Sequence, residues 1–312
     1  MQDFYAQYPS EFQELLKQDF GEDSYIGQGN PASKILIIGK ECTAADFAFT
    51  NNALIWKSKS PENIPNWFEA RSWDAYHPRR PFYGQIMLKD NNSSNNPKSW
   101  DELNRGTSVT WKAQQQFINL LLSPEQQVQP RQLLNFYEHC FMTDLSCNCM
   151  KTSVKNDVTR RSIERRISKG GILAQPFFRK FPVVIFDIYH YFDWYNDLHI
   201  IQNFDGGVLN YTYKGIIVSE ETYSHYDEAT KCRMPLYRAN NKFRKGDFIN
   251  VHESADGKHI LLHTSHFVDN YQPRSLVWMQ ELANIVRPYI DSKRQVYTTQ
   301  TDVNKRCDTA GS

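Results

Sequence analysis

Residues 33–43 read SKILIIGKECT, and this stretch decides how the rest of the chain can fold. Four consecutive aliphatic residues run into Gly39, a pattern typical of a strand that is buried on both faces of a parallel sheet. Thr43 is a suitable N-cap for a helix that follows. The residues 40–42 therefore lie where a strand ends and a helix begins, and open α/β sheets bind ligands at such places.

Three further apolar runs have the same character, and helical periodicity separates them. The expected strands are 34–39, 137–145 (YEHCFMTDL), 182–188 (PVVIFDI) and 259–263 (HILLH), and the expected helices are 1–22, 111–122, 157–169 and 275–290. This alternation predicts an α/β protein of three α/β/α layers with a central four-stranded parallel sheet. Between 201 and 257, β-forming segments separated by Gly and Asn predict an antiparallel β insertion.

Local signals predict where some helices begin and which faces they bury. Ser10 with Gln13 forms a candidate capping box, and Thr110 is a candidate N-cap of the helix over 111–122. The helix over 157–169 is basic. We expect Val158, Ile163 and Ile167 on its inner face, with Arg160, Arg161, Arg165, Arg166 and Lys169 outside.

Composition limits the classes of protein that the chain can be. It has 312 residues, a hydrophobic content of 40%, a net charge of +1 and six cysteines. No apolar run approaches the roughly 20 residues of a membrane span, and the first residues have no signal-peptide pattern. We expect a cytoplasmic monomer that does not contact membranes, with one domain over 1–292, insertions at about 50–106 and 201–257, and a polar tail over 293–312.

Polar side chains follow three of the expected strands, at the point where each strand ends. They are Glu41, Asp144 and the segment 263–266 (HTSH). A carboxylate can act as a general base, and an imidazole can stabilise a departing anion or move a proton. Each residue also has a structural alternative. Glu41 could cap a helix, Asp144 could form a turn, and His263 could be a core histidine whose ring nitrogens are satisfied.

These segments, in this order, resemble the uracil-DNA glycosylase superfamily. In that family one strand ends in Gly-x-(Asp/Asn)-Pro or Gly-Glu-Ala-Pro-Gly, a second ends in a segment with Asn, and the last ends in His-Pro-Ser. The counterparts here are 39–43 (GKECT), 143–146 (TDLS) and 263–267 (HTSHF), and 27–31 (GQGNP) resembles the loop before the first motif. The resemblance spans about 25–290 and depends on these short motifs.

The resemblance implies a role for each residue by its position. Glu41 would activate water, His263 would stabilise the departing base, and Asp144 would read its edge. Phe267 would enter the duplex when the base is flipped out, although it could also pack beneath the last helix. The implied substrate-binding residues are Gly39, Lys40, Cys42, Thr43, Asp144 and Ser265, and the implied DNA-binding residues are His266, Phe267, Arg160 and Arg161. The basic helix that carries the two arginines could equally be a solvated surface.

The chain also departs from the family pattern. Cys42 and Thr264 stand where the family has proline, and Asp144 replaces an amide by an acid, which only accepts hydrogen bonds when it is ionised. The four-cysteine spacing of an iron–sulfur cluster is missing, so we expect no cofactor. A metal site from His259, His263 and His266 is an alternative, but we expect none because residue 266 lies beyond the strand end.

Three functions follow as hypotheses. The first is hydrolysis of the N-glycosidic bond of a base in DNA. The second is a non-catalytic module on the same fold, which holds a nucleotide, a nucleic acid or a protein. The third is a small-molecule hydrolase that uses the carboxylate and the histidine on an unrelated α/β sheet, without salt-dependent affinity for DNA.

Overall fold

The computed structural model describes residues 8–23, 25–40, 109–124, 135–148, 153–227, 229, 238–269 and 272–291. Several predictions fall outside these residues: the roles of Glu41, Cys42 and Thr43, the insertion at 50–106 and the tail over 293–312. No helix within the described ranges is long and apolar enough to cross a membrane.

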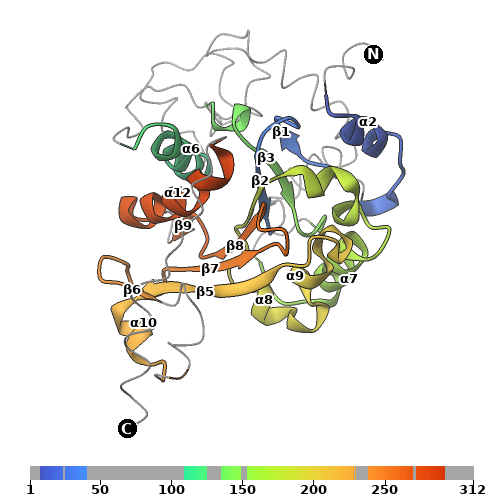
Figure 1. The fold of residues 1–312 in the computed structure, drawn as a ribbon. Helices are drawn as coiled ribbons and strands as arrows, with labels where there is room; N and C mark the ends of the chain where they lie inside the picture. The colour runs from blue at the N-terminus through green and yellow to red at the C-terminus, as the bar shows by residue number, and fades with distance from the viewer. Residues whose placement is uncertain are drawn as a thin grey trace, which may run out of the picture.

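One eight-stranded sheet organises the molecule, in the order β1-β3-β2-β4-β8-β7-β5-β6 (Figure 1). The strands are β1 (Gln28–Gly29), β2 (Ile35–Gly39), β3 (Phe141–Asp144), β4 (Val183–Phe186), β5 (Thr212–Ser219), β6 (Arg238–Asn240), β7 (Phe248–Glu253) and β8 (Ile260–Thr264). The neighbours β3, β2, β4 and β8 pair in parallel, which confirms the predicted four-stranded parallel core.

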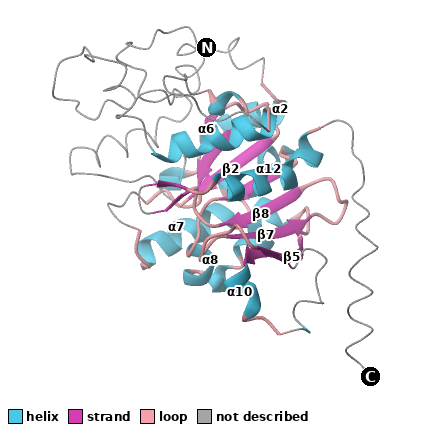
Figure 2. Ribbon diagram, turned by 90° about the vertical axis from the view of Figure 1, so that its left-hand side faces the viewer, coloured by secondary structure: helices cyan, strands magenta, loops and turns pink. Residues whose placement is uncertain are grey.

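The sheet is wider than this core because the insertion extends it. β7 pairs antiparallel with β8, β5 pairs antiparallel with β7, and β6 is parallel to β5. At the other edge β1 pairs antiparallel with β3. Figure 2 shows β2, β8, β7 and β5 as members of one sheet. The predicted antiparallel insertion is thus confirmed, and its hydrogen bonds continue the parallel sheet beyond β8.

Helices cover both faces of the sheet, as the three-layer prediction requires. α6 (Val109–Leu122) and α12 (Leu276–Ile290) lie on one face, and α7 (Asp157–Ile167), α8 (Tyr191–Trp194) and α9 (Ile200–Asn203) lie on the other (Figure 1). Side chains alternate between the two cores along β2, since Ile35 and Ile37 belong to the first core and Leu36 and Ile38 to the second. The remaining elements are α2 (Ser10–Leu16), α10 (Glu220–Ser224), β9 (Val268–Asp269), β10 (Gln272–Pro273) and several short 3-10 helices.

The helix starts were predicted with mixed success. α12 begins at Leu276, one residue after the expected start, and Ser275 is its N-cap, since its Oγ accepts the N–H of Trp278 at 3.2 Å. Thr110 lies inside α6 and does not cap it. The capping box at α2 is also wrong, because Pro9 is the N-cap and the Gln13 amide donates to the carbonyl of Tyr8 at 2.9 Å.

The face assignment of α7 is wrong at two positions. Val158 is 54% exposed, whereas Arg166 is completely buried. The Arg166 guanidinium donates to the carbonyls of Asp23 and Tyr25 at 2.7 and 2.9 Å and to Thr143 Oγ1 at 3.2 Å. An arginine can be buried here because the segment before β2 supplies backbone acceptors for it.

Candidate functional site

The connections of the parallel strands reverse direction between β2 and β4. The chain leaves β2 through α6 to reach β3 on one side, and then returns through α7 to β4 on the other side of β2. In open α/β sheets, ligands bind outside the carboxyl ends of strands at such a switch point. Lys40 directly follows β2 and Asp187 directly follows β4, so both residues lie at this point.

Asp187 is a buried carboxylic acid with two different neighbours. It is 2% exposed, its Oδ1 accepts the N–H of Phe267 at 2.9 Å, and its Oδ2 lies 3.7 Å from Nε2 of His266. Burial raises the pKa of Asp187, while His266, the Phe267 N–H and the charge of Lys40 act in the opposite direction. Perturbed carboxyl groups of this kind are typical of functional sites.

His266 lies beside this carboxyl group and is partly accessible, with 29% of its side chain exposed. Its Nδ1 lies 3.1 Å from the N–H and 3.2 Å from the carbonyl oxygen of Val268. The neutral ring can therefore accept from the N–H, and the charged ring can donate to the carbonyl. Both protonation states of His266 therefore have a partner at Nδ1. When Nδ1 accepts the N–H of Val268, the proton of the neutral ring is on Nε2, beside Asp187.

Lys40 and the aromatic residues between 189 and 194 also lie near the carboxyl ends of β2 and β4. Lys40 Nζ lies 5.8 Å from the centre of the Tyr191 ring, and burial together with the Lys40 charge lowers the pKa of His190. The His190 ring stacks on Trp194 with 5.7 Å between centroids. Tyr189 has a φ of +44°, in the left-handed region that a tyrosine rarely adopts. Strain of this kind clusters at binding and catalytic sites.

Two predicted residues from the first two strands come together at the same edge. Gly39 and Asp144 are register partners in the β2–β3 pair. A Cβ on Gly39 would lie 2.9 Å from Oδ1 of Asp144, so the Asp144 carboxylate lies directly against this glycine. Gly39 and Asp144, two of the predicted substrate-binding residues, therefore lie side by side, and their contact with a substrate stays a prediction.

His263 does not present its ring nitrogens to this edge. Its Nε2 lies 3.1 Å from the carbonyl oxygen of Tyr189, its Nδ1 lies 3.3 Å from the Asn250 amide, and its ring centroid is 4.0 Å from that of Phe192. Burial lowers the pKa of His263 to about 3. The alternative of a core histidine with satisfied nitrogens fits these contacts, and they weaken the prediction that His263 acts in catalysis.

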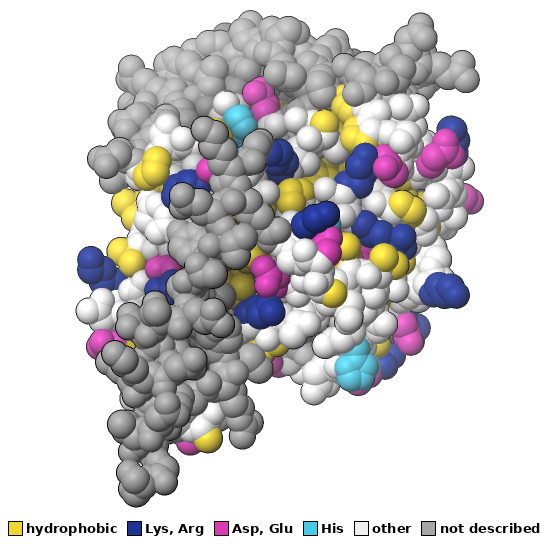
Figure 3. Space-filling view, viewed as in Figure 1, with side chains coloured by type: hydrophobic (Ala, Val, Ile, Leu, Met, Phe, Trp, Pro, Cys, Tyr) yellow, Lys and Arg dark blue, Asp and Glu magenta, His cyan; other side chains and the backbone are white. Residues whose placement is uncertain are grey.

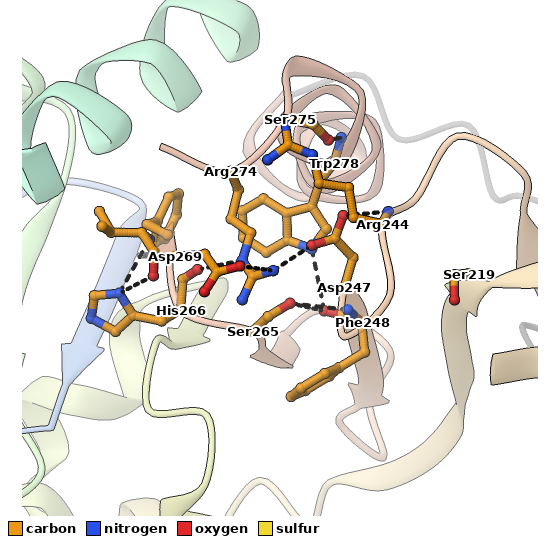
Figure 4. Close-up of polar contacts among 12 residues, drawn as sticks. Ser219, Arg244, Asp247, Phe248, Ser265, His266, Asp269, Arg274, Ser275 and Trp278 are labelled. Atoms are coloured by element: carbon orange, nitrogen blue, oxygen red, sulfur yellow. Dashed lines mark hydrogen bonds and ion pairs between the residues drawn. The ribbon is translucent and has the colours of Figure 1, made fainter. Parts of the chain in front are cut away.

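Ser265 and Phe267 are also structural. Ser265 Oγ accepts the N–H of Phe248 at 2.9 Å and lies 3.2 Å from its carbonyl oxygen. These contacts join the residue after β8 to the first residue of β7 (Figure 4). Phe267 is 0% exposed and packs edge-on against Trp278 and Phe117, with centroids 5.4 and 5.6 Å apart. The prediction that Phe267 enters a duplex is wrong, because its ring belongs to the core beneath α6 and α12.

The predicted arginines lie on the surface of α7. Arg160 forms ion pairs with Asp197 and with Glu164, and Arg161 is exposed. On the face drawn in Figure 3, Lys and Arg side chains alternate with Asp and Glu. DNA binding by Arg160 and Arg161 stays a prediction, and ion pairs that occupy Arg160 weaken it.

The pocket and the possible metal ligands of the described residues were also compared with this edge of the sheet. A groove of about 690 Å³ runs between the end of α6, the turn after β6 and α12, and the strand-end residues do not line it. Within the described ranges, no group of three or more His, Cys, Asp and Glu side chains could hold a metal ion. The described ranges include His259, His263 and His266, the three residues of the alternative metal site.

Asp187 is the site residue that sequence reasoning missed. It follows an apolar run exactly as Asp144 does, in the segment PVVIFDI, so the same strand-end rule could have found it. Comparisons of the chain with models of protein families, with curated proteins and with solved structures find no match. The function is therefore inferred from the geometry of this edge.

Proposed function

We propose that the protein is a hydrolase of the uracil-DNA glycosylase type, which cleaves the N-glycosidic bond of a flipped-out base in DNA. The proposal depends above all on the buried Asp187 carboxyl group, which lies 3.7 Å from Nε2 of His266 at the switch point of the sheet. The order of the strand-end motifs and the α/β fold support it. Asp187 and His266 are the residues to which we assign the acid–base chemistry.

The chemistry follows from the charges at this edge. When the bond between the sugar carbon and the base nitrogen breaks, its electron pair leaves with the base. Protonated His266 donates its Nε2 proton to the departing base, and Lys40 stabilises the negative charge that develops on it. Burial disfavours the ionised form of Asp187, and the charge of protonated His266 favours it, so the ionised carboxylate and the imidazolium stabilise each other. Water then forms the new bond to the sugar carbon and gives a proton to a carboxylate, a role for which Glu41 remains the candidate.

An abasic-site assay tests the proposal. The full chain is incubated with single- and double-stranded DNA that carries uracil, a mismatched thymine or an oxidised base, beside free nucleosides. We expect abasic sites with at least one base in DNA, and a rate about 10²–10⁴-fold lower with the Asp187→Asn variant. Absence of cleavage at every base would overturn the proposal, and cleavage of free nucleosides alone would favour a small-molecule hydrolase.

A non-catalytic binding module is the second candidate. The contacts of His263 favour it. In the family motif this histidine contacts the departing base, but here its ring nitrogens contact the carbonyl of Tyr189 and the amide of Asn250. Asp144 in place of an amide favours it as well. This function requires salt-dependent affinity for a nucleic acid without turnover, and a binding titration at two salt concentrations measures that affinity.

A further inference from the structure

We infer that Arg274 is a positioning residue, which holds the backbone of His266 and Phe267 so that both face Asp187. The inference rests on the proposed function only in treating Asp187 and His266 as the working pair. His266 lies on the short segment between β8 and β9, and Arg274, directly before the N-cap of α12, lies beside this segment (Figure 4).

Arg274 contacts the segment at two successive carbonyl groups. Its side-chain Nε donates to the carbonyl of His266 at 3.0 Å, and its backbone N–H donates to the carbonyl of Phe267 at 2.9 Å. The N–H of Phe267 in turn donates to Asp187 Oδ1 at 2.9 Å. One residue thus fixes both peptide groups that place Asp187 and the His266 ring relative to each other.

A buried carboxylate holds the guanidinium in place. Arg274 Nη1 lies 2.6 Å from Asp247 Oδ1, with the two side chains 5% and 0% exposed, and 3.6 Å from Oδ2 of the more exposed Asp269. Figure 4 shows the Arg274 side chain between these two acids. Asp247 is itself fixed, since its Oδ2 accepts the N–H of Arg244 at 2.9 Å. Neither group of the ion pair can turn away without leaving a charge unpaired in the interior.

The geometry of an arginine is specific to this task. A guanidinium presents several N–H groups in one rigid plane, so it can donate to a carboxylate and to a carbonyl at once. Burial raises the pKa of Asp187, and the charge of Arg274 is one of the contributions that oppose this rise, so the ion pair also acts on the site electrostatically. A lysine at 274 keeps the charge, but it cannot reproduce the fixed pair of contacts to Asp247 and His266.

Nitrogen-15 NMR of the histidine rings in the full chain tests the inference. Histidine-labelled protein is recorded at a pH where the rings are neutral, and the signal of His266 is identified by its loss in His266→Gln. We expect the wild type to show the tautomer with the proton on Nε2. In Arg274→Lys, and in Arg274→Met combined with Asp247→Leu, we expect shifted His266 signals and a mixture of tautomers.

The double variant removes both charges, so it leaves no unpaired charge in the interior. If Arg274→Lys does not fold, the double variant still shows whether the His266 signals change without Arg274. Arg238→Met is the matched control, because Arg238 forms an ion pair with Glu281 of α12, at the groove that the strand-end residues do not line, and we expect it to leave the His266 signals unchanged. His266 signals identical to those of the wild type in the Arg274 variants would overturn the inference, as would an equal change in the control.

The abasic-site assay then separates this inference from the proposed function. If the wild type cleaves DNA, we expect Arg274→Lys to lower kcat at least about tenfold, the effect of misplacing a catalytic group, with little change in KM. If the wild type cleaves nothing, the proposed function fails, and the NMR result still decides whether Arg274 positions His266.

Discussion

An Asp and a His side chain lie close together beyond each end of β8, and the two pairs differ in the burial of the acid and in the direction of its pKa shift. Before the strand, His259 Nδ1 lies 3.4 Å from Asp256 Oδ1, and the Asp256 side chain is 44% exposed. After the strand, His266 Nε2 lies 3.7 Å from Asp187 Oδ2, and the Asp187 side chain is 3% exposed. The residue types and the separations are similar, but access to water is opposite.

The pKa shifts of the two acids are opposite as well. The Ser254 hydroxyl and the Lys258 N–H donate to Asp256, and these hydrogen bonds lower its pKa to about 2. Burial raises the pKa of Asp187. The first acid is an ionised group of a surface turn, whereas the second resists ionisation beside an accessible imidazole. The comparison shows that an Asp–His pair becomes a candidate site through its position in the sheet.

The largest expected difference between the pairs is in activity. Asp187→Asn and His266→Gln should each lower the rate of abasic-site formation by about 10²–10⁴-fold, the usual contribution of an acid–base group. Asp256→Asn and His259→Gln should stay within about twofold of the wild type, because their side chains lie at the opposite edge of the sheet. The assay described above measures all four variants, and equal losses at both ends would refute the distinction.

The next effect concerns the histidine inside β8. His263→Ala should lower the free energy of unfolding by about 2–4 kcal/mol, because it removes the contact with the Tyr189 carbonyl and empties the space beside Phe192. His266→Ala should lower it by less than about 1 kcal/mol, as its ring is partly exposed. Urea denaturation of both variants measures the difference. A larger loss of unfolding free energy in His266→Ala than in His263→Ala would contradict the conclusion that His263 is the buried histidine and His266 the accessible one.

Acid should destabilise the protein through His263. Its pKa is about 3 in the folded protein and about 6.5 when unfolded, so only the unfolded chain binds the proton between these values. This contribution to stability is complete above about pH 6.5 and is lost as the pH falls toward 3, with a loss of about 2 kcal/mol at pH 5. His252, whose pKa is lowered to about 4, acts in the same direction. His263→Asn should flatten the pH profile of urea midpoints, and an unchanged profile would argue against a buried neutral ring.

The smallest expected effect is on the free energy of unfolding, which should change in opposite directions in Asp187→Asn and Asp256→Asn. The raised pKa of Asp187 means that the folded protein keeps the proton to higher pH than the unfolded chain, so stability declines as the pH rises above about 3.8 through the folded pKa. Asp187→Asn should therefore raise the free energy of unfolding at pH 7 by about 1 kcal/mol. Asp256→Asn should lower it slightly, by less than about 1 kcal/mol, because the turn loses an ionised acceptor. Thermal unfolding of the two variants at pH 7 gives both signs.

The sequence was sufficient to predict the parallel core, because buried parallel strands are recognisable as short apolar runs such as ILIIG and VVIF. It could not predict that the insertion continues the sheet, since hydrogen bonds between β7 and β8 leave no pattern in either segment. It could not rank His263 and His266 either. Residues three apart at the end of a strand have the same local sequence signals, and only the aromatic neighbours of His263 decide which ring is buried.

Titration of the aspartate carboxyl carbons by NMR tests the distinction between the two pairs most directly. The signals of Asp187 and Asp256 are identified by their loss in Asp187→Asn and Asp256→Asn, and each is followed through the acid range in the full chain. We expect Asp187 to titrate above the usual aspartate pKa of about 3.8 and Asp256 at about 2. An Asp187 signal that titrates at or below the usual value would contradict the assignment of Asp187 and His266 as the working pair.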